Sequence, residues 1–279
     1  MKLSILIPTK NEEFLKETLV DIEKHKEGDT EVLWEEDKGL GQRGLTNKLA
    51  QKATGDYLMK LDAHCSMAQG FDVELLKEVK NATVVAPALT NLYAYDWICS
   101  KGHRQPNEQF EEIKECPQCK GKVEKAVVWQ PIPKPIMTNY YFDTDLHFQY
   151  CEEQDESPIT ETMSLQGSCF VISKEDYFRL NICDEKFGSW GQQGTEVACK
   201  AWLSGGRVIS TRNTFYSHWF RGRKPAKTED IKKAQQYSKD LFLKNKWEGQ
   251  VKPLAWLIEK FDYQGDWTPE QVKKLCTFW

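Results

Sequence analysis

Long apolar runs are missing from this 279-residue sequence. The first, in MKLSILIPTKNEE, has five residues, too short for a signal-peptide core, and no later segment approaches the ~20 apolar residues of a membrane-spanning helix. An excess of one charge is missing too, since 38 Lys and Arg stand against 42 Asp and Glu. The whole-chain charge therefore indicates neither a nucleic-acid nor a membrane partner, and we expect a cytoplasmic protein.

The sequence contains nine cysteines. Disulfides rarely persist in the cytosol, so reduced thiols and bound metal are expected. Cys99, His103, Cys116 and Cys119 form the pattern C-x3-H-x12-C-x2-C, which is typical of a tetrahedral structural zinc site. The alternative is free thiols in a surface loop, although so polar a segment would then have little to fold around. The other cysteines lie in patterned sequence and are expected to be buried thiols: Cys65, Cys151, Cys169, Cys183, Cys199 and Cys276.

Strand and helix periods alternate over the first hundred residues. The expected strands are residues 3–7, EVLWEED, YLMKLDA and ATVVAPAL, and the helices between them carry Leu15, Leu19 and Ile22, then Leu45, Leu49 and Ala53. Alternation of this kind predicts an α/β fold with a mostly parallel, Rossmann-like sheet. Ligands bind such sheets at the carboxyl ends of the strands.

The pattern also divides the chain into segments. It breaks from 96 to 125, which we interpret as an inserted zinc-binding element, and resumes from SLQGSCFVISKEDYF to FYSHWFRG. We therefore expect a main domain over 1–225, interrupted by the 96–125 insertion, and a helical C-terminal extension over 226–279. TPEQ at 268–271 offers an N-cap threonine, a first-turn proline and a third-position glutamine for a closing helix.

The segment LMKLDAHCS ends an apolar run at an acid and an imidazole. Asp62 and His64 are separated by one residue, so both can point into one crevice if the chain turns after the strand. A carboxylate and an imidazole suit a divalent ion in an otherwise open site. The alternative is an aspartate that caps a turn beside an exposed histidine.

Five motifs occur in an order and approximate spacing that resemble a GT-A glycosyltransferase of family 2 type: IPTKNE, GLTNKLAQKATGDYLMKLDAHC, GSCFVISKEDYF, GSWGQQGTEVACKAWLSGG and HWFRG. The sequence most closely resembles the polypeptide N-acetylgalactosaminyltransferases, over about residues 1–225 without the insertion. The resemblance implies the GT-A fold, a UDP-sugar donor, and manganese or magnesium as cofactor.

The resemblance also implies a ligand set for that metal. Asp62 and His64 match the D-x-H motif, and His218 matches the third ligand, so the ion would be held on the diphosphate of a nucleotide sugar. Arg221 follows at a distance that suits a bidentate phosphate contact. The alternative for His218 is a core histidine beside Trp219.

Positions near the first two strand ends match those that hold the nucleoside in the family: Thr9, Glu12, Glu36 and Asp37. Carboxylates suit a uracil N–H or ribose hydroxyls, because both donate to an acceptor. Arg43 is expected to reach the base or a phosphate. The alternative is that these are ordinary surface charges at strand ends.

The stretch SWGQQGTEVACKAW corresponds to the family's W-G-G-E-N-x-E stretch, in which Trp190 and Glu196 match. Gln193 and Gly194 stand where the family carries Glu and Asn, so the resemblance does not specify the sugar, although Gln193 can bind a sugar hydroxyl. With no carboxylate at 193, a retaining reaction is favoured, and inversion with Glu196 as base is the alternative. The expected catalytic residues are Trp190, Gln193, Glu196 and Arg221.

No motif names the acceptor. From Arg221 to Lys246 nine cations stand against three acids. Most such runs are solvated helix faces, but a basic face beside the crevice can bind a phosphate backbone. We expect 5-hydroxymethylpyrimidine in DNA, by analogy with phage-type modification, in the host cytoplasm if the source is viral. The alternatives are a protein Ser or Thr hydroxyl, a glycan precursor, or a non-catalytic nucleic-acid-binding module on a degenerate transferase fold.

Overall fold

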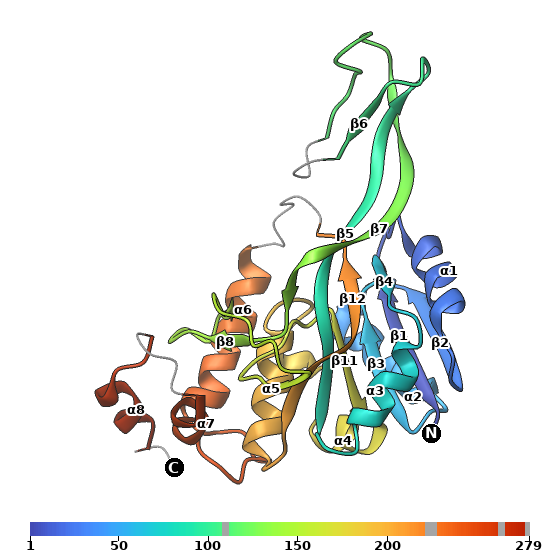
Figure 1. Cartoon of the computed structure of the whole chain (residues 1–279). Helices are drawn as coiled ribbons and strands as arrows, with labels where there is room; N and C mark the ends of the chain where they lie inside the picture. The colour runs from blue at the N-terminus through green and yellow to red at the C-terminus, as the bar shows by residue number, and fades with distance from the viewer. Residues whose placement is uncertain (108–111, 221–227, 262–265, 277–279) are drawn as a thin grey trace.

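The computed structural model describes residues 1–107, 112–220, 228–261 and 266–276, and these form an α/β protein (Figure 1). The strands are β1 Leu3–Thr9, β2 Thr30–Glu36, β3 Tyr57–Leu61, β4 Cys65–Met67, β5 Val84–Cys99, β6 Arg104–Pro106, β7 Val123–Met137, β8 Tyr140–Phe142, β9 Phe148–Tyr150, β10 Ile159–Glu161, β11 Cys169–Ser173 and β12 Val208–His218. The helices are α1 Leu15–His25, α2 Gly41–Lys52, α3 Phe71–Glu78, α4 Lys174–Arg179, the 3-10 turn η2 Glu185–Phe187, α5 Gln193–Leu203, α6 Thr228–Ser238, the π-turn η3 Lys239–Leu243, α7 Leu254–Phe261 and α8 Pro269–Cys276.

The central sheet confirms the predicted fold class. Its strand order is β10-β12-β5-β11-β3-β1-β2, with β11 antiparallel between β3 and β5. The pairs β1–β2, β1–β3 and β5–β12 are parallel. The carboxyl ends of β1, β2, β3 and β12 therefore lie at one edge of the sheet, where α/β proteins bind their ligands.

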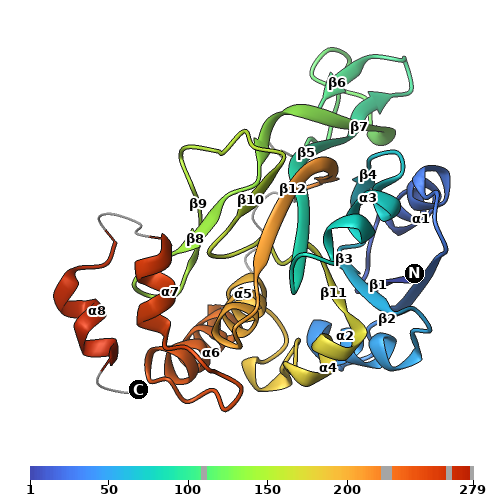
Figure 2. The ribbon, with the colours of Figure 1, turned by 60° about the horizontal axis from the view of Figure 1, so that its bottom comes forward.

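Side chains of β1 alternate between apolar clusters on the two faces of the sheet. Leu3, Ile5 and Ile7 pack with residues of α1 and α3, whereas Leu6 packs with residues of α2, α4 and α5. Because helices cover both faces of the sheet (Figure 2), both sets of side chains are removed from water. This explains why the predicted strands are short, nearly continuous apolar runs.

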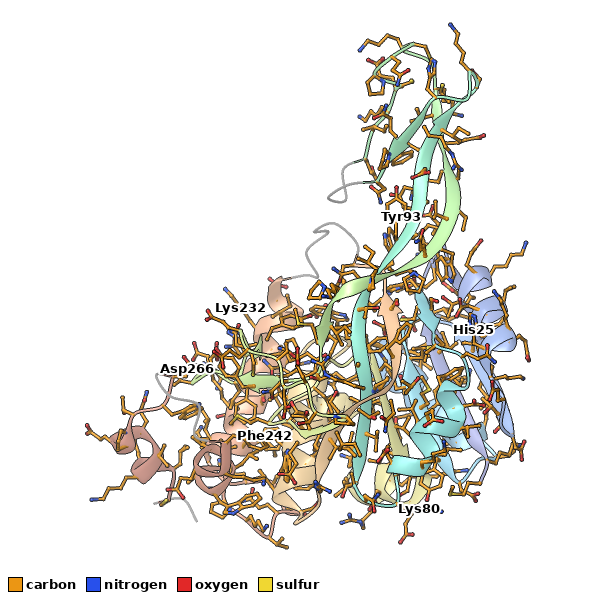
Figure 3. All side chains as sticks on the ribbon, viewed as in Figure 1. His25, Lys80, Tyr93, Lys232, Phe242 and Asp266 are labelled. Atoms are coloured by element: carbon orange, nitrogen blue, oxygen red, sulfur yellow. The ribbon has the colours of Figure 1, made fainter. Side chains whose placement is uncertain are left out.

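A long hairpin extends from the sheet. The pattern break predicted at Asp96 falls inside β5, which continues to Cys99 and pairs antiparallel with β7 as far as the Cys99–Val123 pair. Strand β6 pairs with the same distal part of β5. Figure 1 shows this hairpin projecting from the body of the protein, with Tyr93 near its base in Figure 3. We call the described residues between 92 and 130 the arm.

The C-terminal segment is helical, as predicted. The Thr268 hydroxyl accepts the backbone N–H of Gln271 at 3.3 Å, and the Gln271 side-chain oxygen accepts the N–H of Thr268 at 2.8 Å, which confirms the predicted cap of α8. Cys276, expected to be buried, is exposed, because α8 covers the body with its Leu275 side. Within the described ranges, none of the helices has the length and apolar character needed to cross a membrane.

Candidate active site

Three side chains with metal-binding groups converge at the carboxyl edge of the sheet. Asp62 and His64 follow β3, and His218 ends β12. Their ligand atoms lie within 4.8 Å of one another, and Nε2 of His218 is 3.2 Å from Oδ2 of Asp62. Strand β4 brings them together, because it pairs with β12 so that Cys65 lies opposite His218.

Lys60 was not singled out by the sequence analysis, yet it contacts the same carboxylate. Its side chain is buried, and Nζ donates to Oδ1 of Asp62 and, at 2.8 Å, to the carbonyl of Gly167. Burial by itself raises the pKa of Asp62, but the Lys60 ammonium and the His218 contact outweigh it and hold that pKa well below its usual range. The available signal was a lysine inside the apolar run YLMKLDA.

Both histidines are suited to bind a cation. Burial lowers the pKa of His64 and lowers that of His218 to about 4, so both rings are neutral at neutral pH. Nδ1 of His64 lies 3.1 Å from a carboxylate oxygen of Glu12, the arrangement that orients metal-binding imidazoles. Two neutral imidazoles and an ionised carboxylate are a donor set that fits manganese.

Two cavities adjoin this cluster. One, of about 430 Å³, is lined by residues of the β1, β2 and β3 ends, including Thr9, Asp37 and His64. The other, of about 610 Å³, is lined mostly by uncharged groups, among them Gln166, Gly167 and Gln193. Both cavities are also lined by Gln42, Asp62, Trp190, His218 and Phe220. Asp62 and His218 therefore line both cavities, and His64 lines the smaller one.

Known proteins share this architecture, although no protein-family model matches the chain. The structure of GalNAc-T7 with UDP, GalNAc and Mn2+ superimposes with a TM-score of 0.66 at 15% identity, covering 94% of this chain and 56% of that one. TarS of S. aureus gives a TM-score of 0.52 at 12% identity, covering 94% and 43%. The chain has a GT-A glycosyltransferase fold.

Sequence comparison agrees with the predicted resemblance. Polypeptide N-acetylgalactosaminyltransferase 3 of Taeniopygia guttata is 25% identical over 222 residues, which cover 77% of this chain. The match spans only 32% of that relative's length. The similarity to the N-acetylgalactosaminyltransferases is thus confirmed.

Within the GT-A fold, the expected nucleoside residues divide into two groups. Thr9 and Asp37 line the smaller cavity. Glu36 does not: its carboxylate accepts from the Thr9 hydroxyl at 2.9 Å and from the Asn11 N–H at 2.8 Å. Glu12 lines that cavity and also contacts the candidate metal ligand His64.

Asp37 organises the entry into α2. Its Oδ1 accepts the backbone N–H groups of Gly39, Leu40 and Gly41 at 3.0, 2.8 and 3.1 Å. Burial by itself raises the pKa of Asp37, but these hydrogen bonds and the contact with the Lys10 ammonium outweigh it, so that pKa is lowered. An ionised Asp37 beside the smaller cavity therefore favours a ligand that donates hydrogen bonds.

Arg43 and Glu196 are not where the predicted roles require them. Both are buried, and they form an ion pair with each other; Arg43 also donates to the carbonyl of Gly191 at 2.7 Å, and Lys200 donates to Glu196 at 2.8 Å. Neither residue lines the two cavities. A carboxylate held by two cations, with a lowered pKa despite burial, is a poor base, and a buried guanidinium cannot reach a phosphate.

Of the other predicted catalytic residues, two line a cavity and one lies outside the described part of the chain. Trp190 and Gln193 line the larger cavity, and the Gln193 amide nitrogen lies 3.1 Å from Cys183 Sγ. At Gly194 a Cβ would lie 1.8 Å from the Leu165 carbonyl oxygen, so the loop before β11 leaves no room for the asparagine of the family pattern. Arg221 lies outside the described residues.

A second cluster lies in the arm. The ligand atoms of Cys99, His103, Cys116 and Cys119 are within 4.8 Å of one another, as the spacing predicts for a tetrahedral metal site. Sγ of Cys99 and Cys119 are 3.6 Å apart, and Sγ of Cys116 is 3.6 Å from Nδ1 of His103. Tight turns fold each half of the cluster, with backbone hydrogen bonds of 2.8 Å from Gly102 to Cys99 and from Lys120 to Cys116.

Proposed function

We propose that this protein is a metal-dependent glycosyltransferase that moves a sugar from a nucleotide sugar, expected to be a UDP-sugar, to a hydroxyl acceptor. The observation that carries the proposal is the convergence of Asp62, His64 and His218 beside a cavity in a GT-A fold, with Asp62 and His218 also lining a second cavity. The comparison with an N-acetylgalactosaminyltransferase that binds UDP, GalNAc and Mn2+ supports it. The chain spans about a third of the length of that N-acetylgalactosaminyltransferase 3 relative.

In this proposal each cavity takes one part of the donor. The smaller cavity takes the nucleoside, with Thr9 and Asp37 at its wall, and the larger takes the sugar and the acceptor, with Gln193 and Trp190 at its wall. Asp62, His64 and His218 would hold manganese, which supplies a Lewis acid for the charge of the departing diphosphate. Lys60 keeps Oδ1 of Asp62 occupied, which leaves Oδ2 turned toward His218.

The larger cavity supports a retaining reaction. Among the described residues that line it, Asp62 is the one carboxylate, and Lys60 already binds it. We propose that the bond from the anomeric carbon to the diphosphate breaks, the acceptor oxygen bonds on the same face, and the acceptor proton passes to the departing phosphate oxygen. No protein carboxylate is needed as a base in this scheme.

The test is hydrolysis and transfer from UDP-sugars, measured with manganese, with magnesium and with a chelator. We expect release of UDP that requires a divalent ion. If no nucleotide sugar binds or turns over under any of these conditions, the result contradicts the proposal and favours the alternative of a non-catalytic nucleic-acid-binding module. A mixed set of DNA, peptide and glycan acceptors in the same assay, read by mass spectrometry, identifies the acceptor.

For the acceptor we propose 5-hydroxymethylpyrimidine in DNA. Support comes from Lys232, labelled in Figure 3, and Lys233, which are exposed on α6. They directly follow Ile231, a residue that lines the larger cavity. The rest of the described basic segment supports it less, because Lys239 pairs with Asp145 and Lys244 pairs with Asp240. Arg221, Arg223, Lys224 and Lys227 lie outside the described residues.

Salt dependence tests the DNA proposal. Replacing Lys232 and Lys233 by alanine should reduce the slope of log affinity against log salt by about one unit for each phosphate that the variant no longer binds. The matched control replaces the adjacent lysines Lys273 and Lys274 of α8, and it should keep the parent slope. Equal slopes in all three proteins would leave these lysines as a solvated helix face and favour a peptide or glycan acceptor.

We also propose that the arm cluster of Cys99, His103, Cys116 and Cys119 holds a structural zinc ion, since four protein ligands leave no position for a substrate. The division into a catalytic domain over 1–225, an inserted element over 96–125 and an extension over 226–279 is part of this proposal. A cytoplasmic location is supported by the nine cysteines, all of which are free of disulfides.

A further inference from the structure

A third apolar cluster joins the arm to the candidate active site. Its buried members are Phe14, Leu92, Ala94, Tyr95, Trp97, Cys99, Cys116, Val123 and Trp219. Cys99 and Cys116 belong to the zinc cluster, whereas Trp219 directly follows the candidate metal ligand His218. One continuous set of packed side chains therefore contacts both candidate metal sites.

Aromatic rings carry this connection. Along the arm, the Trp97 and Tyr95 ring centroids are 5.3 Å apart, and Tyr95 is 6.0 Å from Trp219. Phe14 packs edge-on against Trp219 at 4.8 Å and stacks on Tyr95 at 5.7 Å. Such ring pairs have preferred geometries, so displacing one ring disturbs the positions of its neighbours.

Lys125 of the arm contacts residues that follow β1 in the body of the protein. Nζ of Lys125, on β7, lies 4.5 Å from the centroid of the Tyr95 ring and also within 6 Å of the Phe14 and Trp219 rings. The same ammonium pairs with Glu13 at 2.6 Å. Because Glu13 adjoins Phe14, the contact ties the arm to the loop after β1.

The cluster reaches the candidate metal ligands from two sides. Trp219 donates its backbone N–H to the carbonyl of His64 at 3.0 Å, and its ring centroid is 6.1 Å from that of His64. On the other side, Phe14 is two residues from Glu12, whose carboxylate contacts Nδ1 of His64. Both contacts set the orientation of His64, and metal affinity depends on such outer contacts.

The described residues of the distal arm have little apolar packing. Among those beyond Trp97, the apolar side chains that join the cluster are Val123 and, partly buried, Ile113, together with three of the cysteines. Without a bound metal, the four ligand groups would not be held together, and little apolar burial would be left to stabilise this end. The pairing of β5 with β6 and with the start of β7 therefore depends on the cluster.

We propose that zinc in the arm is a positioning element for the active site: by fixing the distal arm it holds the aromatic cluster, and through Trp219 and Phe14 it sets the orientation of His64 and the affinity for the manganese ion. This inference rests on the proposed function, because it assumes that Asp62, His64 and His218 bind the second ion. It assigns the zinc a role in manganese binding as well as in stability.

The test uses the full chain and two direct measurements, zinc content by elemental analysis and manganese affinity by electron paramagnetic resonance titration. The parent should contain about one zinc per chain and bind manganese. Cys119→Ser should lose the zinc and bind manganese about tenfold or more weakly. The matched control is Cys276→Ser, a change at an exposed cysteine of α8, and it should match the parent in both measurements.

A second variant separates the connection from the zinc itself. Trp97→Leu leaves all four zinc ligands in place but removes the ring that packs on Tyr95, so it should keep zinc and still weaken manganese binding. If Cys119→Ser loses zinc but binds manganese like the parent, or if the parent contains no zinc, the inference is overturned. A parent that holds zinc but binds no manganese would instead contradict the proposed function, and the inference with it.

Discussion

Asp62→Asn is expected to lower turnover of the UDP-sugar about a thousandfold or more, because a bound divalent ion contributes several kcal/mol of charge stabilisation and each ~1.4 kcal/mol is a factor of ten. The substitution keeps the shape of the side chain but removes the charge that faces His218 and Lys60. Manganese affinity, measured by paramagnetic resonance, should fall together with turnover.

The matched control is Asp29→Asn, the same chemical change at an exposed position just before β2, at the opposite end of that strand from the site. It should retain parent turnover and manganese affinity. Circular dichroism of both variants establishes that the fold is kept. Turnover of Asp62→Asn within about tenfold of the parent, and insensitive to a chelator, would show that Asp62 is not a ligand of a required metal.

Arg43→Met is expected to lower the free energy of unfolding by about 3–5 kcal/mol, because it removes a partner of a fully buried carboxylate. Glu196 would keep Lys200 and the backbone N–H of Asp184, but it would no longer pair with a guanidinium. The variant also lacks the hydrogen bond from Arg43 to the Gly191 carbonyl, which holds the loop after Trp190. Urea unfolding measures the change.

Lys48→Met is the matched control, since it removes a cation from the same helix α2. Lys48 pairs with Glu35, but its side chain is 41% exposed and Lys52 also binds that carboxylate. A surface pair of this kind contributes about 0–1 kcal/mol. An equal decrease in unfolding free energy in the two variants would mean that the Arg43–Glu196 pair does not stabilise the fold more than a surface pair does.

Features encoded over a few neighbouring residues were predictable. The period of apolar residues located β1 to β3 and the helices between them, and TPEQ located the start of α8. The spacing of Asp62 and His64, and of the four zinc-type ligands, predicted clusters that the structure does bring together. These features depend on backbone geometry within a turn or a strand, which the local sequence largely specifies.

Partners chosen by packing were not predictable in this way. Arg43 was expected to contact a nucleotide, yet it binds Glu196, 153 positions away, because α2 and α5 bury both charges in the same layer. Lys60 lies in a strand, and its position there does not indicate its partners. The loop before β11 places the Gly167 carbonyl beside its ammonium group. A buried charge must find a partner, but which partner depends on elements that are distant in the chain.

The sequence by itself determined the α/β fold class, the D-x-H pair and the ligand set in the arm, because strand and helix periods and short ligand spacings are local properties. The predicted third ligand, His218, came from the family resemblance, and the structure places it beside Asp62, 156 positions away. Only the tertiary structure decided that Glu196 is buried in an ion pair with Arg43 and that the arm packs on Trp219. The physical reason is that long-range contacts depend on the register of β4 against β12 and on which faces of helices and strands are buried together.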